Sequence, residues 1–164
     1  MTTRTTTSVP GLEISTRDDD SPRLGYGGRI WVHVTGDATG GAFGMWEGTL
    51  PPDGSSPIHI HHNEDECVYV MEGTLLFVCG DEQWESGPGT WVKMPRGVPH
   101  GIRAMGETPV RFLEFFLPAG LEQLFTLLPE SRPDTPPDMA RILAVAKRYG
   151  LEFLAPMPTE ARPD

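Results

Sequence analysis

Hydrophobic and polar residues alternate along a series of short stretches in the middle of the chain. In residues 29–35, every second residue from Ile30 onward is apolar and β-branched, whereas His33 falls on the opposite face. Alternating or continuous apolar patterns return at residues 42–50, 66–71, 74–78, 82–85, 90–94, 100–104 and 110–117. Glycine and proline residues, which favour turns, separate these stretches. Eight or more short strands at regular spacing predict an all-β protein, and we expect a jelly-roll β-barrel.

The periodicity changes from strand to helix after Pro118. Four apolar residues then recur at helical spacing, which predicts a short amphipathic helix over residues 121–128. A proline-rich linker over residues 129–137 leads to a second helix, which begins at a capping-box-like segment before Met139 and ends at Gly150. We expect both short C-terminal helices to pack on the barrel, where Phe125 or Tyr149 can contact a ligand.

These patterns divide the chain into four segments. We expect a flexible N-terminal arm (residues 1–28), a barrel (29–118), a C-terminal helical extension (119–154) and a disordered tail (155–164). A chain of 164 residues fits one domain, because that length is enough to bury a sizeable core without disulfides.

Two histidines separated by one residue begin the stretch that carries most of the chemistry. On an extended strand, His59 and His61 point to the same face, while Ile60 packs on the other side. Glu66 opens the next apolar run, and a short acidic turn brings its carboxylate back over the two imidazoles. Two neutral imidazoles and a carboxylate suit one divalent transition metal, such as Fe, Mn, Ni, Cu or Zn.

A second stretch supplies a fourth candidate ligand, His100, which follows a tight turn at Pro95 and Gly97. The two stretches read G-x4-H-x-H-x4-E-x6-G over residues 54–73 and G-x5-P-x-G-x2-H over residues 89–100. In this order and spacing they resemble the two motifs of the cupin superfamily, and the resemblance covers roughly residues 28–118. It implies that the metal ligands are His59, His61, Glu66 and His100.

The chain departs from the cupin pattern in two places. The first motif has one residue fewer before its first histidine, and Ala104 stands where the second motif usually ends in asparagine. Neither change removes a ligand.

The resemblance also implies a function. Three histidines and one glutamate around a divalent ion leave one or two positions open, as catalytic sites require. We expect a dioxygenase-type oxidoreductase similar to the quercetin 2,3-dioxygenase-like cupins, acting on an aromatic or polyketide-like molecule, with Glu66 also serving as the catalytic base. The alternatives are a metal-assisted cyclase or isomerase, similar to the tetracenomycin-type polyketide cyclases, and a cupin that binds a small molecule without catalysis.

Composition limits the partners. The net charge of −10, from 13 basic and 23 acidic residues, argues against a nucleic-acid partner, which would need a basic face. No apolar run approaches membrane-spanning length, so we expect no membrane partner. Two cysteines without a secretory signal favour the cytoplasm. Cupins commonly dimerise through their terminal strands, so the resemblance implies a homodimer.

Several polar residues near the motifs have less defined roles. We interpret His33 as a hydrogen-bonded strand residue, with a catalytic role as the alternative. His62 is expected to be exposed or to lie next to the ligands, with replacement of a ligand as the alternative. Glu64 and Asp65 are expected to be solvated, and Arg96 to lie on the surface.

The pocket is expected to be largely apolar. Its candidate wall residues are Met45, Trp46, Trp91, Met94, Phe112, Phe115 and Phe116, although most of them must simply be core. Few basic side chains lie in the predicted strands, which disfavours phosphorylated substrates.

Overall fold

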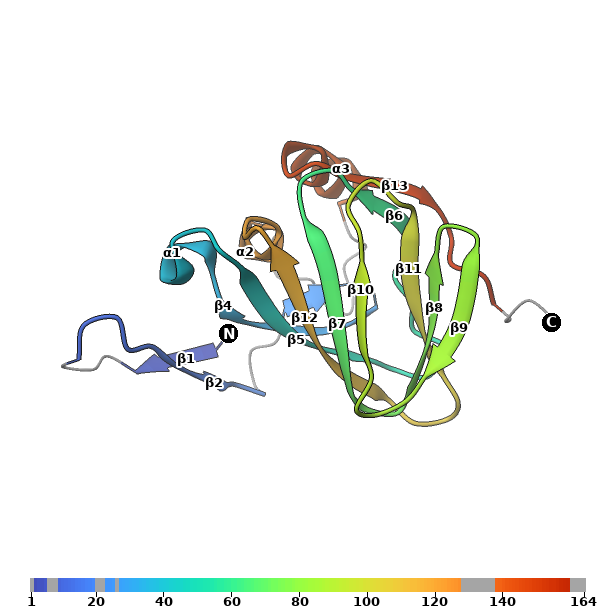
Figure 1. The fold of residues 1–164 in the computed structure, drawn as a ribbon, viewed down its shortest axis with the longest axis horizontal. Coiled ribbons are helices and arrows are strands. Elements are labelled where there is room, and N and C mark those ends of the chain that lie inside the picture. Colours follow the sequence, from blue (N-terminus) through green and yellow to red (C-terminus); the bar gives the residue numbers. More distant parts are fainter. Residues whose placement is uncertain (1, 6–8, 20–22, 26, 128–137, 160–164) are drawn as a thin grey trace.

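The computed structural model describes residues 2–5, 9–19, 23–25, 27–127 and 138–159. In this part of the chain, strands β1 to β13 form two facing antiparallel sheets and a separate two-stranded pair (Figure 1). The helices are short, and the C-terminal ones lie at one end of the two sheets (Figure 1). This architecture confirms the predicted all-β jelly-roll fold with short C-terminal helices.

The larger sheet contains six strands in the order β10-β7-β12-β5-β4-β3. Their bounds are Trp91–Met94 (β10), Asp65–Glu72 (β7), Val110–Leu117 (β12), Gly44–Leu50 (β5), Gly28–Val34 (β4) and Arg23–Gly25 (β3). β12 pairs antiparallel with both β5 and β7, so it lies inside the sheet. Burial alternates along it, and its buried row consists of Val110, Phe112, Glu114 and Phe116.

The smaller sheet contains five strands in the order β13-β6-β11-β8-β9. Their bounds are Leu151–Ala155 (β13), Ile58–His61 (β6), His100–Met105 (β11), Thr74–Cys79 (β8) and Glu82–Ser86 (β9). The two motif strands β6 and β11 are neighbours, and His100 pairs directly with His59. At Gly73 the chain passes from β7 in one sheet to β8 in the other with φ at 77°, a value that favours glycine.

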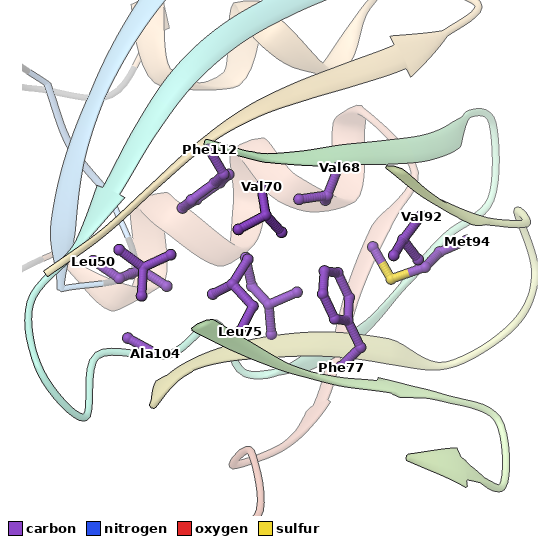
Figure 2. Close-up of a cluster of buried hydrophobic side chains, with 11 residues drawn as sticks. Leu50, Val68, Val70, Leu75, Phe77, Val92, Met94, Ala104 and Phe112 are labelled. Atoms are coloured by element: carbon purple, nitrogen blue, oxygen red, sulfur yellow. The ribbon is translucent and has the colours of Figure 1, made fainter. Parts of the chain in front are cut away.

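The main hydrophobic core lies between the two sheets. Val68, Val70 and Phe112 from the larger sheet point toward Leu75 and Phe77 from the smaller one (Figure 2). Leu50, Val92, Met94, Ile102, Ala104 and Val110 complete this buried cluster. Since these residues occupy alternate positions on their strands, the period-two pattern of the sequence accounts for the core.

A second apolar cluster closes the end of the barrel nearest the histidines. It includes side chains from the 3₁₀ helix η1 (Leu121–Gln123) and the α-helices α2 (Leu124–Leu127) and α3 (Met139–Arg148). Its buried members are Ile30, Trp46, Phe116, Leu121, Leu124, Phe125, Ala146 and Leu151. Both predicted helices are therefore present, but Leu128 and the linker 129–137 lie outside the described residues. β13, which follows α3 and pairs with β6, is not predicted by the sequence pattern.

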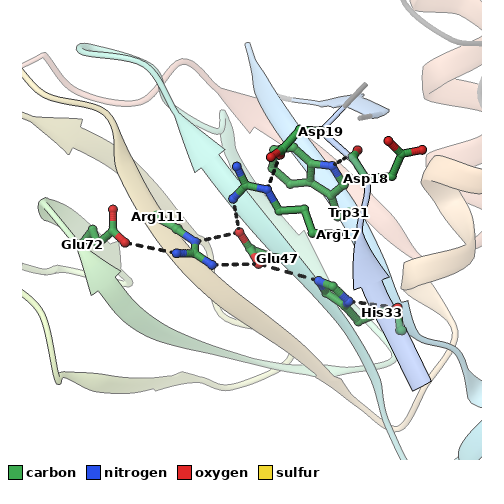
Figure 3. A network of polar contacts seen from close by, with 9 residues as sticks. Arg17, Asp18, Asp19, Trp31, His33, Glu47, Glu72 and Arg111 are labelled. Atoms are coloured by element: carbon green, nitrogen blue, oxygen red, sulfur yellow. Dashed lines mark hydrogen bonds and ion pairs between the residues drawn. The ribbon is translucent and has the colours of Figure 1, made fainter. Parts of the chain in front are cut away.

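The N-terminal segment pairs with itself and contacts the larger sheet. β1 (Thr2–Thr5) pairs with β2 (Ile14–Arg17), and α1 (Gly36–Thr39) follows β4. Arg17 at the end of β2 pairs with Glu47 of β5 and stacks over the ring of Trp31 (Figure 3). The division into arm, barrel, extension and tail stays a prediction, and residues 160–164 of the tail lie outside the described residues. No helix in the described part of the chain is long and apolar enough to cross a membrane.

Candidate metal centre

Three strands, two from the smaller sheet and one from the larger, bring the four candidate ligands to one buried point. His59 and His61 lie two residues apart on β6, so both point to the inner side of the sheet. His100 begins β11 beside His59, and Glu66 reaches the same point from β7 in the opposite sheet. All four side chains are at most 3% exposed, and one donor atom from each lies within 4.8 Å of the others.

The carboxylate of Glu66 lies at the centre of the three imidazoles. Its Oε2 atom is 2.8 Å from Nε2 of His61, 3.3 Å from Nε2 of His100 and 3.6 Å from Nε2 of His59. The His61 contact is close but lacks hydrogen-bond geometry, and His61 Nε2 has no hydrogen-bond partner among the described residues. Donor atoms that crowd one point in this way, with one left unpaired, fit a divalent transition metal better than a hydrogen-bond network.

The outer nitrogens of two histidines are fixed by the backbone. Nδ1 of His59 donates to the carbonyl of Pro57 at 2.8 Å, and Nδ1 of His100 donates to the carbonyl of Val98 at 2.8 Å. A carbonyl only accepts, so the proton of each neutral ring is on Nδ1 and the lone pair is on Nε2, which faces the cluster. The donor set is therefore arranged to bind a metal, and the residues present fit one.

Burial and proximity shift the pKa values in the cluster. Burial lowers the pKa of His59, although Glu66 opposes this effect. Burial also lowers the pKa of His61, but Glu64 and Glu66 outweigh it and raise the pKa to about 9. Burial raises the pKa of Glu66, yet the neighbouring histidines, His100 first, hold it well below its usual value. Without a metal, the carboxylate of Glu66 is thus ionised among the imidazoles.

A further buried carboxyl group, Glu114, lies beside Glu66 on the inner face of β12. Burial and the charge of Glu66 raise its pKa well above the usual value, so this group favours the protonated form. Its Oε2 accepts a hydrogen bond from Nε1 of Trp46 at 2.5 Å. In the sequence, Glu114 reads only as a break in an apolar run, although it lies on the same face of the strand as Phe112 and Phe116.

A narrow cleft leads away from the cluster between the sheets. Its empty volume is about 360 Å³, part of it open to solvent, and its enclosed part has room for about one water molecule. The side chains of Ile30, Leu50, Ser56, Ile102 and Phe112 line it together with His59, Glu66 and Glu114. The exposed surface of the lining is largely apolar, as predicted, and its polar residues are Arg29, Thr49, Ser56, His59, Glu66 and Glu114.

Part of the predicted wall is wrong. Trp46, Met94, Phe112 and Phe116 are buried, and Phe116 stacks on His61 with ring centroids 5.8 Å apart. Trp91 is 52% exposed, and its ring centroid lies 5.3 Å from that of Phe115. Trp91, Phe115 and Met45 each occupy the strand positions that alternate with the buried ones. They therefore cover the outer face of the larger sheet.

Glu64 corrects another expectation. We predicted it to be solvated, but it is only 3% exposed and its Oε2 lies 3.7 Å from Nδ1 of His61. Asp65 is half-buried and pairs with Lys93 at 2.8 Å and with Arg96 at 3.2 Å. Arg96 is on the surface, as predicted.

The two remaining histidines lie away from the cluster. His62 is exposed and contacts Glu152 at 3.0 Å. His33 lies on the outer side of the larger sheet, bonded to Ser15 Oγ at 3.0 Å and 3.7 Å from Glu47 (Figure 3). Its interpretation as a hydrogen-bonded strand residue fits this position.

Two facing antiparallel sheets around a buried cluster of three histidines and one glutamate define a jelly-roll barrel with a candidate metal centre. Residues 46–116 match the family model of the Cupin domain, so the chain contains a small cupin domain. One curated relative, an uncharacterized protein of Methanocaldococcus jannaschii, is 28% identical over 67 residues. That match covers 41% of this chain and about half of the relative, 54%.

Solved cupin structures resemble the chain over different lengths. A Cupin 2 conserved barrel domain protein from Salinispora arenicola is 19% identical with a TM-score of 0.57, and the match covers 84% of this chain and 98% of that one. The polyketide cyclase RemF from Streptomyces resistomycificus is 29% identical with a TM-score of 0.50, over 56% of this chain and 65% of that one. Oxalate decarboxylase from Bacillus subtilis is 26% identical with a TM-score of 0.53, over 60% of this chain and 27% of that one.

Proposed function

We propose that the protein is a metal-dependent enzyme that binds one divalent transition metal through His59, His61, Glu66 and His100 and acts on a small organic molecule. The observation that carries this proposal is the convergence of four buried donor atoms within 4.8 Å, with two rings already fixed in the metal-binding tautomer. A bound ion would supply either redox chemistry with O2 or Lewis-acid polarisation of a substrate carbonyl. The ion itself is Fe, Mn, Ni, Cu or Zn, since the ligand set accepts each of them.

The first form of this function is a dioxygenase for an aromatic or polyketide-like substrate. The apolar cleft excludes water from the reacting groups and suits a ring-bearing molecule. Glu66 acts as the catalytic base, because it is ionised, buried and within reach of a hydroxyl that enters the cleft. The enclosed space takes only about one water molecule, so a ring-bearing substrate has to widen the cleft as it enters.

The second form is a metal-assisted cyclase or isomerase, and a specific observation favours it. Glu66 and Glu114 are adjacent carboxyl groups of which one is ionised and the other favours its proton. Such a pair can take a proton from one carbon or oxygen and return one to another without any oxidant. The likeness to the polyketide cyclase RemF supports the same form.

The remaining elements of the proposal concern the setting of the protein. We infer a homodimer in the cytoplasm, with a small molecule as the substrate and neither nucleic acid nor membrane as a partner. Size-exclusion chromatography with light scattering tests the oligomeric state; a monomer at micromolar concentration would exclude the dimer.

Oxygen consumption separates the two chemical forms. The protein is reconstituted with each metal in turn and screened with flavonol-like and polyketide substrates, in air and under nitrogen. Oxygen uptake coupled to product formation supports the dioxygenase, and turnover under nitrogen supports the cyclase or isomerase. Tight binding of a ligand that is recovered unchanged under both conditions would instead leave a non-catalytic binding protein.

A further inference from the structure

The three histidines differ in what their outer nitrogens face. His59 and His100 each donate from Nδ1 to a backbone carbonyl, which fixes the ring. Nδ1 of His61 instead faces Oε2 of Glu64 at 3.7 Å, which is too long for a hydrogen bond. Both atoms are buried, and neither has a hydrogen-bond partner among the described residues.

Glu64 occupies this position because of the loop that carries it. The loop connects β6 to β7, and its first two residues, His62 and Asn63, are exposed. Glu64 turns inward and is 3% exposed. Its Oε1 lies close to Gly120, since a Cβ added to Gly120 would be 3.5 Å from this oxygen. The carboxylate is therefore enclosed between the loop before β7 and the segment that follows β12.

Metal binding would make Nδ1 of His61 and Oε2 of Glu64 hydrogen-bond partners of each other. A neutral histidine that coordinates through Nε2 carries its proton on Nδ1, and a buried N–H needs an acceptor. In metalloproteins this acceptor is usually a backbone carbonyl or a carboxylate, which holds the ring in its tautomer and orientation. Of the two kinds of acceptor, the structure offers carbonyls to His59 and His100 and a carboxylate to His61.

We propose that Glu64 is a positioning residue of the metal centre, which accepts the Nδ1–H of His61 when His61 coordinates the metal. The inference rests on the proposed metal centre and adds a residue outside the four ligands. A small rotation of either side chain shortens the 3.7 Å separation to a hydrogen bond. A carboxylate partner also makes His61 a stronger electron donor than the two histidines that face carbonyls.

The test uses the zinc-loaded protein, because zinc is diamagnetic and permits NMR of the histidine rings. Glu64→Gln keeps the shape and a neutral acceptor oxygen, Glu64→Ala removes the acceptor, and Glu85→Gln on the exposed side of β9 is the matched control. Zinc affinity is measured by competition with a chelator. We expect affinity to fall about 10–100-fold in Glu64→Ala, less in Glu64→Gln and not at all in the control.

Ring-nitrogen correlation spectra supply a readout that does not depend on activity. In the zinc-loaded wild type we expect His61 to be protonated at Nδ1, with a proton resonance shifted downfield by its carboxylate partner. That shift moves in both Glu64 variants, while the Nδ1 proton of His100 provides an unchanged internal reference. Circular dichroism confirms that each variant is folded.

Two results would overturn the inference in distinguishable ways. If Glu64→Ala and Glu64→Gln bind zinc as tightly as wild type and leave the His61 resonance in place, Glu64 has no positioning role, although the metal centre stands. If the wild type binds no zinc or other divalent metal, the metal centre fails and the role of Glu64 fails with it.

Discussion

Replacing Glu47 tests how the larger sheet is held together around the site. Its side chain is 6% exposed and accepts hydrogen bonds from Nη1 of Arg17 at 2.6 Å and Nε of Arg111 at 2.7 Å (Figure 3). Arg17 belongs to β2 and Arg111 to β12, so one carboxylate on β5 links three strands. The inner faces of β5 and β12 carry Trp46 and Glu114, so this network supports the strands that build the candidate centre.

The size of the effect follows from the partners. A hydrogen bond to a charged group contributes about 1.5–3 kcal/mol. The side chains of Arg17 and Arg111 are 32% and 33% exposed, so water screens part of each interaction. We expect Glu47→Gln to lower the free energy of unfolding by about 2–4 kcal/mol at pH 7, which corresponds to a Tm lower by about 4–16 °C.

The effect depends on pH in a defined direction. Burial raises the pKa of Glu47, but the hydrogen bonds from Arg111 and Arg17 outweigh it and lower the pKa below the usual 4.5. A carboxyl group of this kind stabilises the fold above pH 4.5, and the contribution is lost as the pH falls through the folded pKa. The difference between wild type and Glu47→Gln therefore shrinks at acidic pH.

His33 adds to the acid sensitivity of the same network. Burial lowers its pKa below 6.5, although Glu47 opposes this effect and Arg111 and Arg17 reinforce it. The unfolded chain thus binds a proton more readily than the folded one, and stability falls as the pH drops below 6.5. Replacing His33 with Gln should reduce the loss of stability between pH 6.5 and pH 5.

Urea and thermal unfolding at several pH values measure these effects. Glu72→Gln is the matched control, because Glu72 bonds the same Arg111 at 3.1 Å but is 64% exposed. An exposed pair contributes less than about 1 kcal/mol. If Glu47→Gln destabilised the protein no more than Glu72→Gln, the reasoning about the buried carboxylate would be refuted.

Three further predictions concern the core and the site. Gly48→Ala places a Cβ 2.5 Å from the ring of Phe112 and should cost about 1–3 kcal/mol in urea unfolding; an unchanged midpoint would contradict the close packing of β5 on β12. Glu114→Gln should keep the metal content but lower turnover about 10²–10⁴-fold on the substrate found in the screen, whereas full activity would remove Glu114 from the acid–base pair. A divalent metal at about 100 times its Kd should raise the free energy of unfolding by about 2.7 kcal/mol, and a chelator should reverse this gain. A Tm that is the same with and without metal would count against specific binding.

The position of the cluster was predictable because strand geometry and turn spacing are local properties. The two-residue spacing of His59 and His61 determines that both face inward, and alternation along β7 places Glu66 with Val68 and Val70. The same alternation places Trp91 on the opposite face of β10 from Val92 and Met94. The prediction of the pocket wall was wrong for Trp91 because it did not apply this alternation.

The remaining features depend on contacts between distant segments. Glu64 sits in a loop, where no period distinguishes an inward residue from its exposed neighbours His62 and Asn63. Its burial requires the segment around Gly120, which lies far along the chain. β13 is similar, because a short strand after a helix is defined by its pairing with β6 rather than by its own pattern.

Metal analysis tests the central claim most directly. Wild type, the double variant His59→Ala/His100→Ala and the control His62→Ala are purified and reconstituted side by side. His62 is exposed and directly follows β6, the strand of His59 and His61. The account predicts about one divalent ion per chain in wild type and control and none in the double variant. Equal metal content in all three proteins, or none in the wild type after reconstitution, would contradict a metal centre at His59, His61, Glu66 and His100.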